Sequence, residues 1–175
     1  MHKDNPVNLF FLRHGEAGQP LSVPGRDYER PLTEAGRREV KTVAESMLDL
    51  GIKPDRIVTS PLKRSHDTAV IAARVYNCPD KLEDWDELKP EGNKTQLMLR
   101  LSKLKQNSDI LLVGHEPYLS LLLGDIVAGT PSSHFALKKT GLAKVRMTSF
   151  APKASGELRW LLTPRHLKRM RKKRK

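Results

Sequence analysis

Two short apolar runs, each followed within two residues by a histidine, constrain the fold of this chain more than any other feature. The first run covers residues 7–12 and precedes His14, and the second covers residues 110–113 and precedes His115. Runs this short and this rich in branched and aromatic side chains predict strands buried on both faces, as in parallel sheets. Ligands of open α/β sheets bind outside the carboxyl ends of the strands, so we expect both histidines in one pocket.

The rest of the chain alternates between strand and helix signals. Thr33 is a suitable cap for a helix that apolar spacing extends to about Leu50. Ser60 and Pro61 predict the start of another helix, with the serine as its cap and the proline in its first turn. The remaining signals predict a strand at 55–59, helices at 93–106 and 117–128, and a late hairpin with strands at 142–150 and 157–161. This alternation predicts an α/β domain.

Length and composition fit one globular domain. The chain has 175 residues, of which 38% are hydrophobic and 30% charged, enough for one packed core. Its one cysteine, Cys78, cannot form an internal disulfide, which agrees with a reducing cytosol. The first residues lack the apolar segment of a signal peptide, and the apolar stretch at 118–129 is interrupted and too short to span a membrane. We therefore expect a soluble, cytoplasmic protein without integral membrane association.

Positive charge is concentrated at the carboxyl end. Residues 165–175 hold eight of the 32 lysines and arginines and no acid, whereas the rest of the chain holds 24 basic and 20 acidic residues. We therefore divide the chain into a domain at 1–164 and a basic tail at 165–175, frayed beyond about Met170. Three functions of the tail stay open: a solubilising end, contact with a polyanion such as RNA, DNA or polyphosphate, and contact with an anionic membrane.

The residues near the two histidines suit phosphate chemistry. A phosphoryl group in transfer spreads negative charge over its oxygens, so it needs positive donors around it and a nucleophile in line. Arg13 and Arg64 can supply guanidinium forks, and the backbone N–H groups of Gly15 and Glu116 can add donors. Nearby arginines would lower the pKa of a histidine and keep it neutral and nucleophilic. These arguments alone do not decide which histidine attacks.

Several motifs occur together between about residues 8 and 167. They are Arg13-His14-Gly15, Arg30-Pro31-Leu32-Thr33 with Gly36, Ser60-Pro61 with Arg64 and Thr68, Glu87-Leu88 with Pro90 and Gly92, Gly114-His115, and Trp160 with Pro164 and Leu167. With this set of motifs the chain resembles the histidine phosphatase superfamily. The order and spacing of the motifs resemble those of its small SixA-type phosphohistidine phosphatases. The resemblance implies a phosphoglycerate mutase-like fold: a single domain of three layers, α/β/α, with a mostly parallel central sheet.

The resemblance also implies roles for individual residues. His14 would be the nucleophile and form a phosphohistidine intermediate that water hydrolyses, while His115 would donate a hydrogen bond to the phosphate. Glu87 stands roughly where broader members of the superfamily place an acidic proton donor. No cofactor is implied, and the other four histidines lack the spacing of metal ligands. Arg26 and Arg30 either line the entrance of the pocket or are solvated loop arginines.

The expected substrate follows from the leaving group and from the size of the chain. An imidazole leaves easily, whereas an alkoxide needs a proton donor. Only 50 residues separate Arg64 from His115, too few for the capping segments of larger relatives, which favours an open pocket. The sequence therefore predicts a phosphatase acting on phosphohistidine of a signalling or phosphotransfer protein. The alternatives are a phosphatase of small phosphomonoesters and a non-catalytic protein that binds phosphate or another polyanion.

Overall fold

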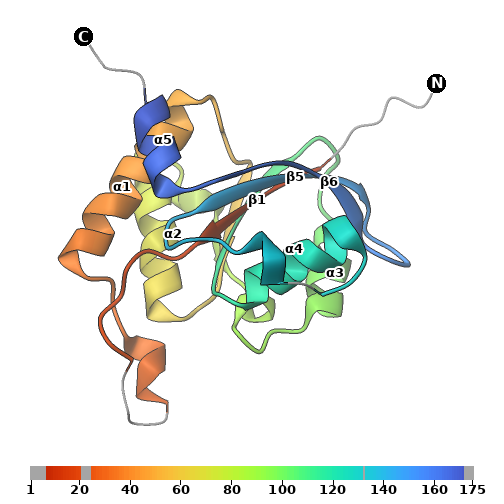
Figure 1. Ribbon diagram of the computed structural model, residues 1–175, viewed down its shortest axis with the longest axis horizontal. Coiled ribbons are helices and arrows are strands. Elements are labelled where there is room, and N and C mark those ends of the chain that lie inside the picture. Colours follow the sequence, from red (N-terminus) through yellow and green to blue (C-terminus); the bar gives the residue numbers. More distant parts are fainter. Residues whose placement is uncertain (1–6, 21–24, 132, 172–175) are drawn as a thin grey trace.

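One mixed sheet of six strands forms the centre of the protein (Figure 1). The computed structural model describes residues 7–20, 25–131 and 133–171. Within these residues the strands lie in the order β3-β2-β4-β1-β5-β6, and the first four of them run parallel, while β5 and β6 are antiparallel additions. The bounds are Asn8–Arg13 for β1, Arg56–Thr59 for β2, Leu82–Asp84 for β3, Asp109–Gly114 for β4, Leu142–Ser149 for β5 and Ser155–Leu162 for β6.

Helices cover both faces of the sheet. Side chains of a strand alternate between the faces, so Leu9 and Phe11 belong to one core cluster, whereas Phe10 and Leu12 belong to the other. The first cluster includes residues of α3 (Lys94–Ser102) and α4 (Tyr118–Ala128), and the second includes residues of α1 (Glu34–Asp49), α2 (Lys63–Val75) and α5 (Pro164–Met170). The predicted three-layer α/β/α domain with a mostly parallel sheet is confirmed.

Local sequence signals explain where the first helix begins. The Thr33 side chain accepts a hydrogen bond from the Gly36 N–H, as the expected cap of α1 should. The glycine at position 15 has a packing reason, because a Cβ there would lie 2.5 Å from Cγ2 of Val40. The loop after β1 and helix α1 therefore approach each other closely, which fixes the turn that carries His14.

Two predicted helix boundaries are wrong. Helix α2 begins at Lys63 with Leu62 as its cap residue, and not at Ser60 and Pro61. The Ser60 hydroxyl instead accepts a hydrogen bond from the Leu62 N–H and contacts His115, which follows the neighbouring strand β4. Helix α3 ends at Ser102, short of the expected end at residue 106, and is followed by a turn with Asn107 at a φ of 59°. The short strand β3 and helix α5 were not predicted.

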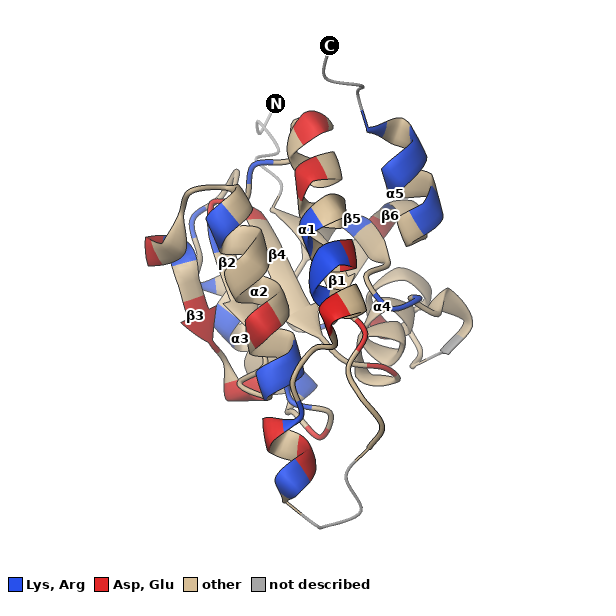
Figure 2. Cartoon of the chain, turned by 90° about the vertical axis from the view of Figure 1, so that its left-hand side faces the viewer, with Lys and Arg blue, Asp and Glu red and all other residues tan. Residues whose placement is uncertain are grey.

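Helix α5 connects the start of the basic tail to the domain. It begins at Pro164, and Leu167 on its inner side is fully buried. Acidic residues of α1 face the cations of α5 and of the residue after it, with Lys168 bonded to Glu39 at 2.7 Å and Arg171 to Glu45 at 2.8 Å (Figure 2). The expected fraying beyond about Met170 falls mainly on residues 172–175, which lie outside the described residues. No helix in the described part of the chain is long and apolar enough to cross a membrane.

Candidate active site

The sheet order brings both predicted histidines to one edge. His14 follows β1 and donates its backbone N–H to the Gly114 carbonyl at 3.0 Å, while Ser60 follows β2 and donates its own to Val113 at 3.1 Å. Because β4 lies between β1 and β2, His115 comes to lie between His14 and Ser60. The centres of the two imidazole rings are 5.1 Å apart. The expectation that both histidines share one pocket is confirmed.

This pocket, which we call the catalytic cavity, has a volume of about 650 Å³ and an unusual concentration of charged and titratable groups. It brings together all four side chains for which we predicted a catalytic role, although they come from distant parts of the chain. The described residues that line it are Arg13, His14, Glu16, Ala17, Gly18, Gln19, Pro20, Arg30, Thr33, Ala35, Arg64, Pro90, His115, Glu116 and Lys139.

The environment of His14 suits a nucleophile. Burial, together with the charges of Arg64, Arg13 and Arg30, lowers its pKa from 6.5 to about 4, against a hydrogen bond to Gly15 that raises it. The ring is therefore neutral at pH 7. Its Nδ1 lies 2.7 Å from the Gly15 carbonyl, which can only accept, so Nδ1 carries the proton. The lone pair is left on Nε2, the nitrogen available for attack.

His115 is also neutral and is oriented by a buried serine. Burial, followed by the charges of His14 and the arginines, lowers its pKa to about 2. Its Nε2 lies 2.8 Å from the hydroxyl of Ser60, a side chain with no exposed surface. The Ser60 oxygen accepts from the Leu62 N–H, and the hydroxyl proton can be donated to Nε2. Nδ1 of His115 then carries the ring proton, and it has no partner among the described residues.

Arg13 and Arg64 are each anchored to a main-chain oxygen. Nη1 of Arg13 donates to the Leu137 carbonyl, and Nη1 of Arg64 donates to the Asp27 carbonyl, both at 2.9 Å. Arg64 also forms an ion pair of 3.1 Å with the Asp27 carboxylate, and only 6% of Arg64 is exposed. A guanidinium group has five N–H donors, so each arginine keeps donors for a phosphate after anchoring.

The structure corrects the expectation for Gly15 as a backbone donor. Its N–H already donates to Oγ1 of Thr68 at 3.1 Å. Oγ1 of Thr68 in turn donates to the Arg64 carbonyl at 2.7 Å, so this threonine ties the His14 turn to the first turns of α2. The corresponding role of the Glu116 N–H stays a prediction. The Glu116 side chain itself accepts a hydrogen bond from Ser120.

Glu87 does not line the cavity as an acid should. Its carboxylate forms an ion pair of 3.2 Å with Arg100 of α3, and Glu87 is absent from the described lining of the cavity. The backbone carbonyl of Glu87 accepts a hydrogen bond of 2.7 Å from the Tyr118 hydroxyl. The carboxylates that do line the cavity are also engaged, since Glu16 faces Thr33 and Lys139, at 3.4 and 3.5 Å.

Sequence reasoning missed three residues of this site. Ser60 was interpreted as a helix cap, Thr68 was quoted only as part of a motif, and Asp27 was not singled out at all. The signal for Ser60 was present, because a polar residue directly after a buried strand lies at the same sheet edge as the histidines. Asp27 gave no such signal, since it lies in an irregular loop, within a short 3-10 helix at Arg26–Glu29.

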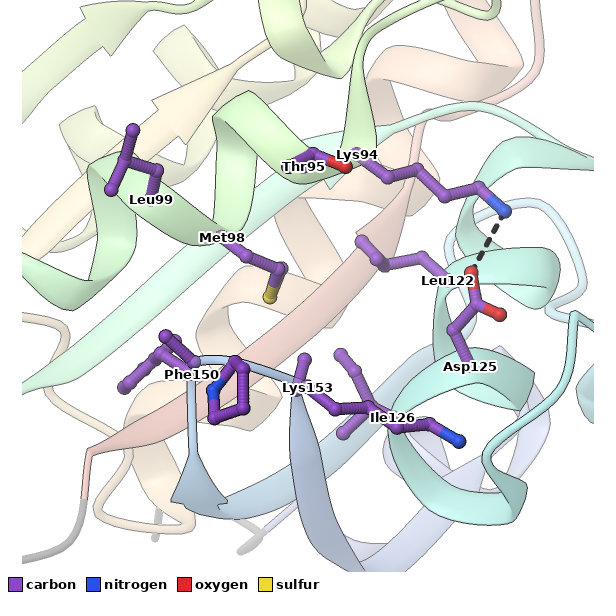
Figure 3. A pocket seen from close by; sticks show the side chains of 12 residues that line it. Lys94, Thr95, Met98, Leu99, Leu122, Asp125, Ile126, Phe150 and Lys153 are labelled. Carbon is purple, nitrogen blue, oxygen red and sulfur yellow. Dashed lines mark hydrogen bonds and ion pairs between the residues drawn. The ribbon is translucent and has the colours of Figure 1, made fainter.

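A second pocket, which we call the apolar pocket, shares no lining residue with the catalytic cavity. It has a volume of about 320 Å³ and lies between α3, α4 and the turn from β5 to β6 (Figure 3). Met98, Leu122 and Ile126 form much of its wall, and Lys94 and Asp125 pair at 3.0 Å on one side. Among the described residues, no group of three or more His, Cys, Asp or Glu could hold a metal ion.

Comparisons with known proteins agree with this geometry. The family model described as Histidine phosphatase superfamily (branch 1) matches residues 9–96. An uncharacterized protein of Picosynechococcus sp. is 33% identical over 142 residues, which cover 80% of this chain and 85% of the relative. Phosphohistidine phosphatase SixA of Escherichia coli is 24% identical over 164 residues, which cover 93% of this chain and 97% of the relative.

Solved structures show the same fold. The protein histidine phosphatase SixA complexed with tungstate aligns with a TM-score of 0.78 and 25% identity, over 91% of this chain and 99% of that one. A phosphoserine phosphatase of Entamoeba histolytica, in complex with 3-phosphoglyceric acid, aligns with a TM-score of 0.67 and 20% identity, over 92% and 99% of the two chains. At that identity the second likeness concerns the fold alone.

Proposed function

Because this chain belongs to the histidine phosphatase superfamily and is of the SixA type, we propose that it hydrolyses phosphohistidine on a protein through a phosphorylated His14. The observation that carries the proposal is the pairing of a neutral His14, with its lone pair on Nε2, with anchored guanidinium groups in one cavity. A neutral imidazole can attack phosphorus, and the fixed cations stabilise the charge that develops on the phosphoryl oxygens.

The reaction divides into two transfers. In the first, the His14 Nε2 lone pair attacks phosphorus, the bond to the substrate's ring nitrogen breaks, and its electron pair stays on that nitrogen. In the second, the oxygen of a water molecule attacks phosphorus, the bond between phosphorus and Nε2 of His14 breaks, its electron pair returns to Nε2, and the water protons leave with the phosphate. Arg13 and Arg64 hold the phosphoryl oxygens in both transfers, and His115 donates from Nδ1. The anchors of these groups mean that little reorganisation accompanies each step.

The position of Glu87 supports an imidazole leaving group. An alkoxide leaves poorly without a proton, and the carboxylic acid expected to supply it is turned toward Arg100. An imidazole leaving group requires no such acid. The proposed substrate is therefore a phosphohistidine-bearing signalling or phosphotransfer protein, met in the cytoplasm. A small phosphomonoester and a non-hydrolysed polyanion are the competing ligands.

A substrate panel tests the proposal. Phosphate release is measured at pH 7 from a phosphohistidine protein, from phosphoserine and from sugar phosphates, with His14→Ala as the blank. We expect release that depends on His14 from the phosphohistidine protein, and at least about a hundredfold less from the monoesters, because their leaving groups need protonation. A preference for a monoester would indicate a phosphatase of small metabolites instead. Binding without phosphate release would indicate a polyanion-binding protein.

A further inference from the structure

Arg30 is anchored in the same way as the two arginines already placed at the phosphate. Its Nη1 donates to a main-chain carbonyl, that of Gly18, at 2.6 Å, as Nη1 of Arg13 and of Arg64 do to carbonyls of their own. The Arg30 side chain is only 15% exposed and lines the same cavity. It is therefore not the solvated loop arginine that its place in the sequence also allowed.

The carboxylate of Asp27 joins Arg30 to Arg64. Its Oδ1 lies 2.7 Å from Nε of Arg30, and its Oδ2 lies 3.1 Å from Nη1 of Arg64. Two guanidinium groups this close to one another repel, and a shared carboxylate offsets the repulsion. Asp27 thus fixes the distance and the orientation of both cations before any ligand arrives.

Arg30 keeps donors for a ligand after these contacts. The Asp27 carboxylate accepts a hydrogen bond from Nη2 at 3.4 Å, and the Gly18 carbonyl accepts one from Nη1, while Nε only forms the ion pair with Asp27. These two hydrogen bonds use one N–H on each terminal nitrogen, so a second N–H on each of them remains. Two parallel donors of this kind match two oxygens of a phosphate.

The electrostatics of the cavity agree with a third cation near the reacting groups. The charge of Arg30 contributes to the lowered pKa of both His14 and His115. Within the cavity, Glu16 faces Lys139, which cancels its charge, and Glu116 is bonded to Ser120. Lys139 and the three arginines carry four positive charges, against three negative charges on Glu16, Glu116 and Asp27, so one positive charge is in excess where a phosphate dianion would bind.

We propose that Arg30 is a third phosphate-binding guanidinium of the catalytic cavity, and that Asp27 is the positioning residue that holds it beside Arg64. The proposal rests on the proposed function only in naming a phosphoryl group as the ligand. Binding of inorganic phosphate can be measured without turnover, so the two proposals can fail separately.

The first test compares substitutions of two different arginines, each of which removes one positive charge. Calorimetric titration with inorganic phosphate, at fixed ionic strength, is made on the native chain, on Arg30→Gln and on Arg26→Gln. Arg26 is exposed and lies outside the described lining of the cavity, so it controls for net charge. We expect about tenfold weaker binding for Arg30→Gln, the value of a charged hydrogen-bond pair, and less than about twofold for Arg26→Gln. Equal effects of the two variants would overturn the proposal.

A second readout separates a local change from misfolding. The pKa of His14 is followed by NMR titration in the same three proteins. Losing the Arg30 charge should raise this pKa by a fraction of its total shift, because burial, the larger cause, is retained. A return of both His14 and His115 to 6.5 would indicate loss of the fold, and the phosphate result would then be taken from Arg30→Lys, which keeps the charge but loses the fork.

Asp27→Asn tests the positioning role by the sign of its effect. If Asp27 positions the two guanidinium groups, phosphate binds several-fold more weakly to the amide variant, and KM rises more than kcat falls. If Asp27 only neutralises charge, its removal makes the cavity more positive and phosphate binds more tightly. The tighter binding would overturn the positioning role. Glu29→Gln, an exposed residue of the same 3-10 helix, is the matched control.

The closing comparison sets turnover beside binding. If the native chain releases no phosphate from any substrate, but phosphate binds more weakly to Arg30→Gln, the inference about Arg30 is supported and the proposed function is refuted. Normal turnover with unchanged phosphate affinity in Arg30→Gln would refute the inference about Arg30 and leave the proposed function standing.

Discussion

The catalytic cavity and the apolar pocket differ in where their side chains come from. The catalytic cavity collects polar side chains from loops after β1 and β4 and from the start of α2, which meet at one edge of the sheet. The apolar pocket collects side chains from α3 and α4, which elsewhere pack against the core, and from the turn between β5 and β6. The larger cavity is thus lined mainly by polar side chains at the ends of strands and helices, and the smaller one mainly by two helices and a turn.

This difference teaches that a concave shape alone does not indicate chemistry. Both histidines of the catalytic cavity have a strongly lowered pKa, whereas the apolar pocket is lined mainly by apolar side chains, with the Lys94–Asp125 ion pair on one side. Perturbed groups with specific partners are typical of active sites. The following predictions test whether function is confined to the catalytic cavity.

The largest effect is expected for His14→Asn. Loss of the nucleophile should reduce turnover by a factor of about 10⁴ or more, as for other covalent catalysts. Quenching in alkaline denaturant after reaction with a ³²P-labelled substrate should leave label on the native protein and none on the variant, because the P–N bond of phosphohistidine survives in base and hydrolyses in acid. Label retained by His14→Asn would move the nucleophile to another residue, with His115 as the first candidate.

Arg64→Gln is expected to have the next largest effect. Removing one preorganised donor to the transferring phosphoryl group should reduce kcat by a factor of about 10² to 10³. Steady-state kinetics on the phosphohistidine protein measure it, and Arg74→Gln, on an exposed turn of the same helix, is the control. A loss below about tenfold would mean that Arg64 is mainly a partner of Asp27.

Ser60→Ala should have a smaller effect, because the serine acts only through His115. Without the hydroxyl the imidazole can rotate or change tautomer, and about tenfold in kcat should be lost. The ¹⁵N chemical shifts of His115 report the tautomer directly and should change in the variant. Ser46→Ala, a fully buried serine of α1 far from the cavity, should change neither quantity.

The pH dependence should be nearly flat in the range where histidines ordinarily titrate. Because the pKa of His14 is about 4, kcat/KM should change less than about twofold between pH 8 and pH 5.5, against about tenfold for a group with a pKa of 6.5. The unfolded chain, with a pKa of 6.5, binds the proton first as the pH falls. The contribution of neutral His14 to the free energy of unfolding is therefore complete above pH 6.5 and is lost between pH 6.5 and about 4.

That loss amounts to about 3 kcal/mol for His14, taking 1.36 kcal/mol per pKa unit. Denaturant unfolding at several pH values measures it. In His14→Asn this part of the pH dependence should disappear. A native chain whose stability is constant from pH 7 to pH 4 would contradict the lowered pKa values.

The smallest effect on turnover is expected in the apolar pocket. Lys94→Met breaks the ion pair with Asp125 but keeps the apolar stem, so stability should change by about 1 kcal/mol or less. Turnover of the phosphohistidine protein should stay within about twofold of the native value, because no residue of this pocket reaches the reacting groups. A larger loss would show that the two cavities are coupled.

The parts of the molecule that the sequence predicted are those with a strong local signal. The strands before His14 and His115 are short apolar runs. Their central position in the sheet can be predicted without knowing which strands pair with them. Thr33 caps its helix through a contact three residues away. Placing the two histidines in one cavity required only the rule on the carboxyl ends of strands.

The parts that could not be predicted depend on contacts between distant residues. Ser60 resembles a helix cap until β4 places His115 within 2.8 Å of it. Glu87 resembles a proton donor until α3 presents Arg100 to it. Strand β3, only three residues long, exists because its edge pairs with β2, and a segment this short has no periodicity of its own.

The anchoring of the arginines through main-chain carbonyls has an evolutionary consequence. Leu137 and Gly18 orient Arg13 and Arg30 with backbone oxygen atoms, which every amino acid possesses. Substitutions at these anchor positions can therefore drift without disturbing the guanidinium groups, as long as the path of the loop is kept. Relatives can share the same arrangement of cations while their loop sequences diverge, and alignments of those loops will understate how similar the sites are.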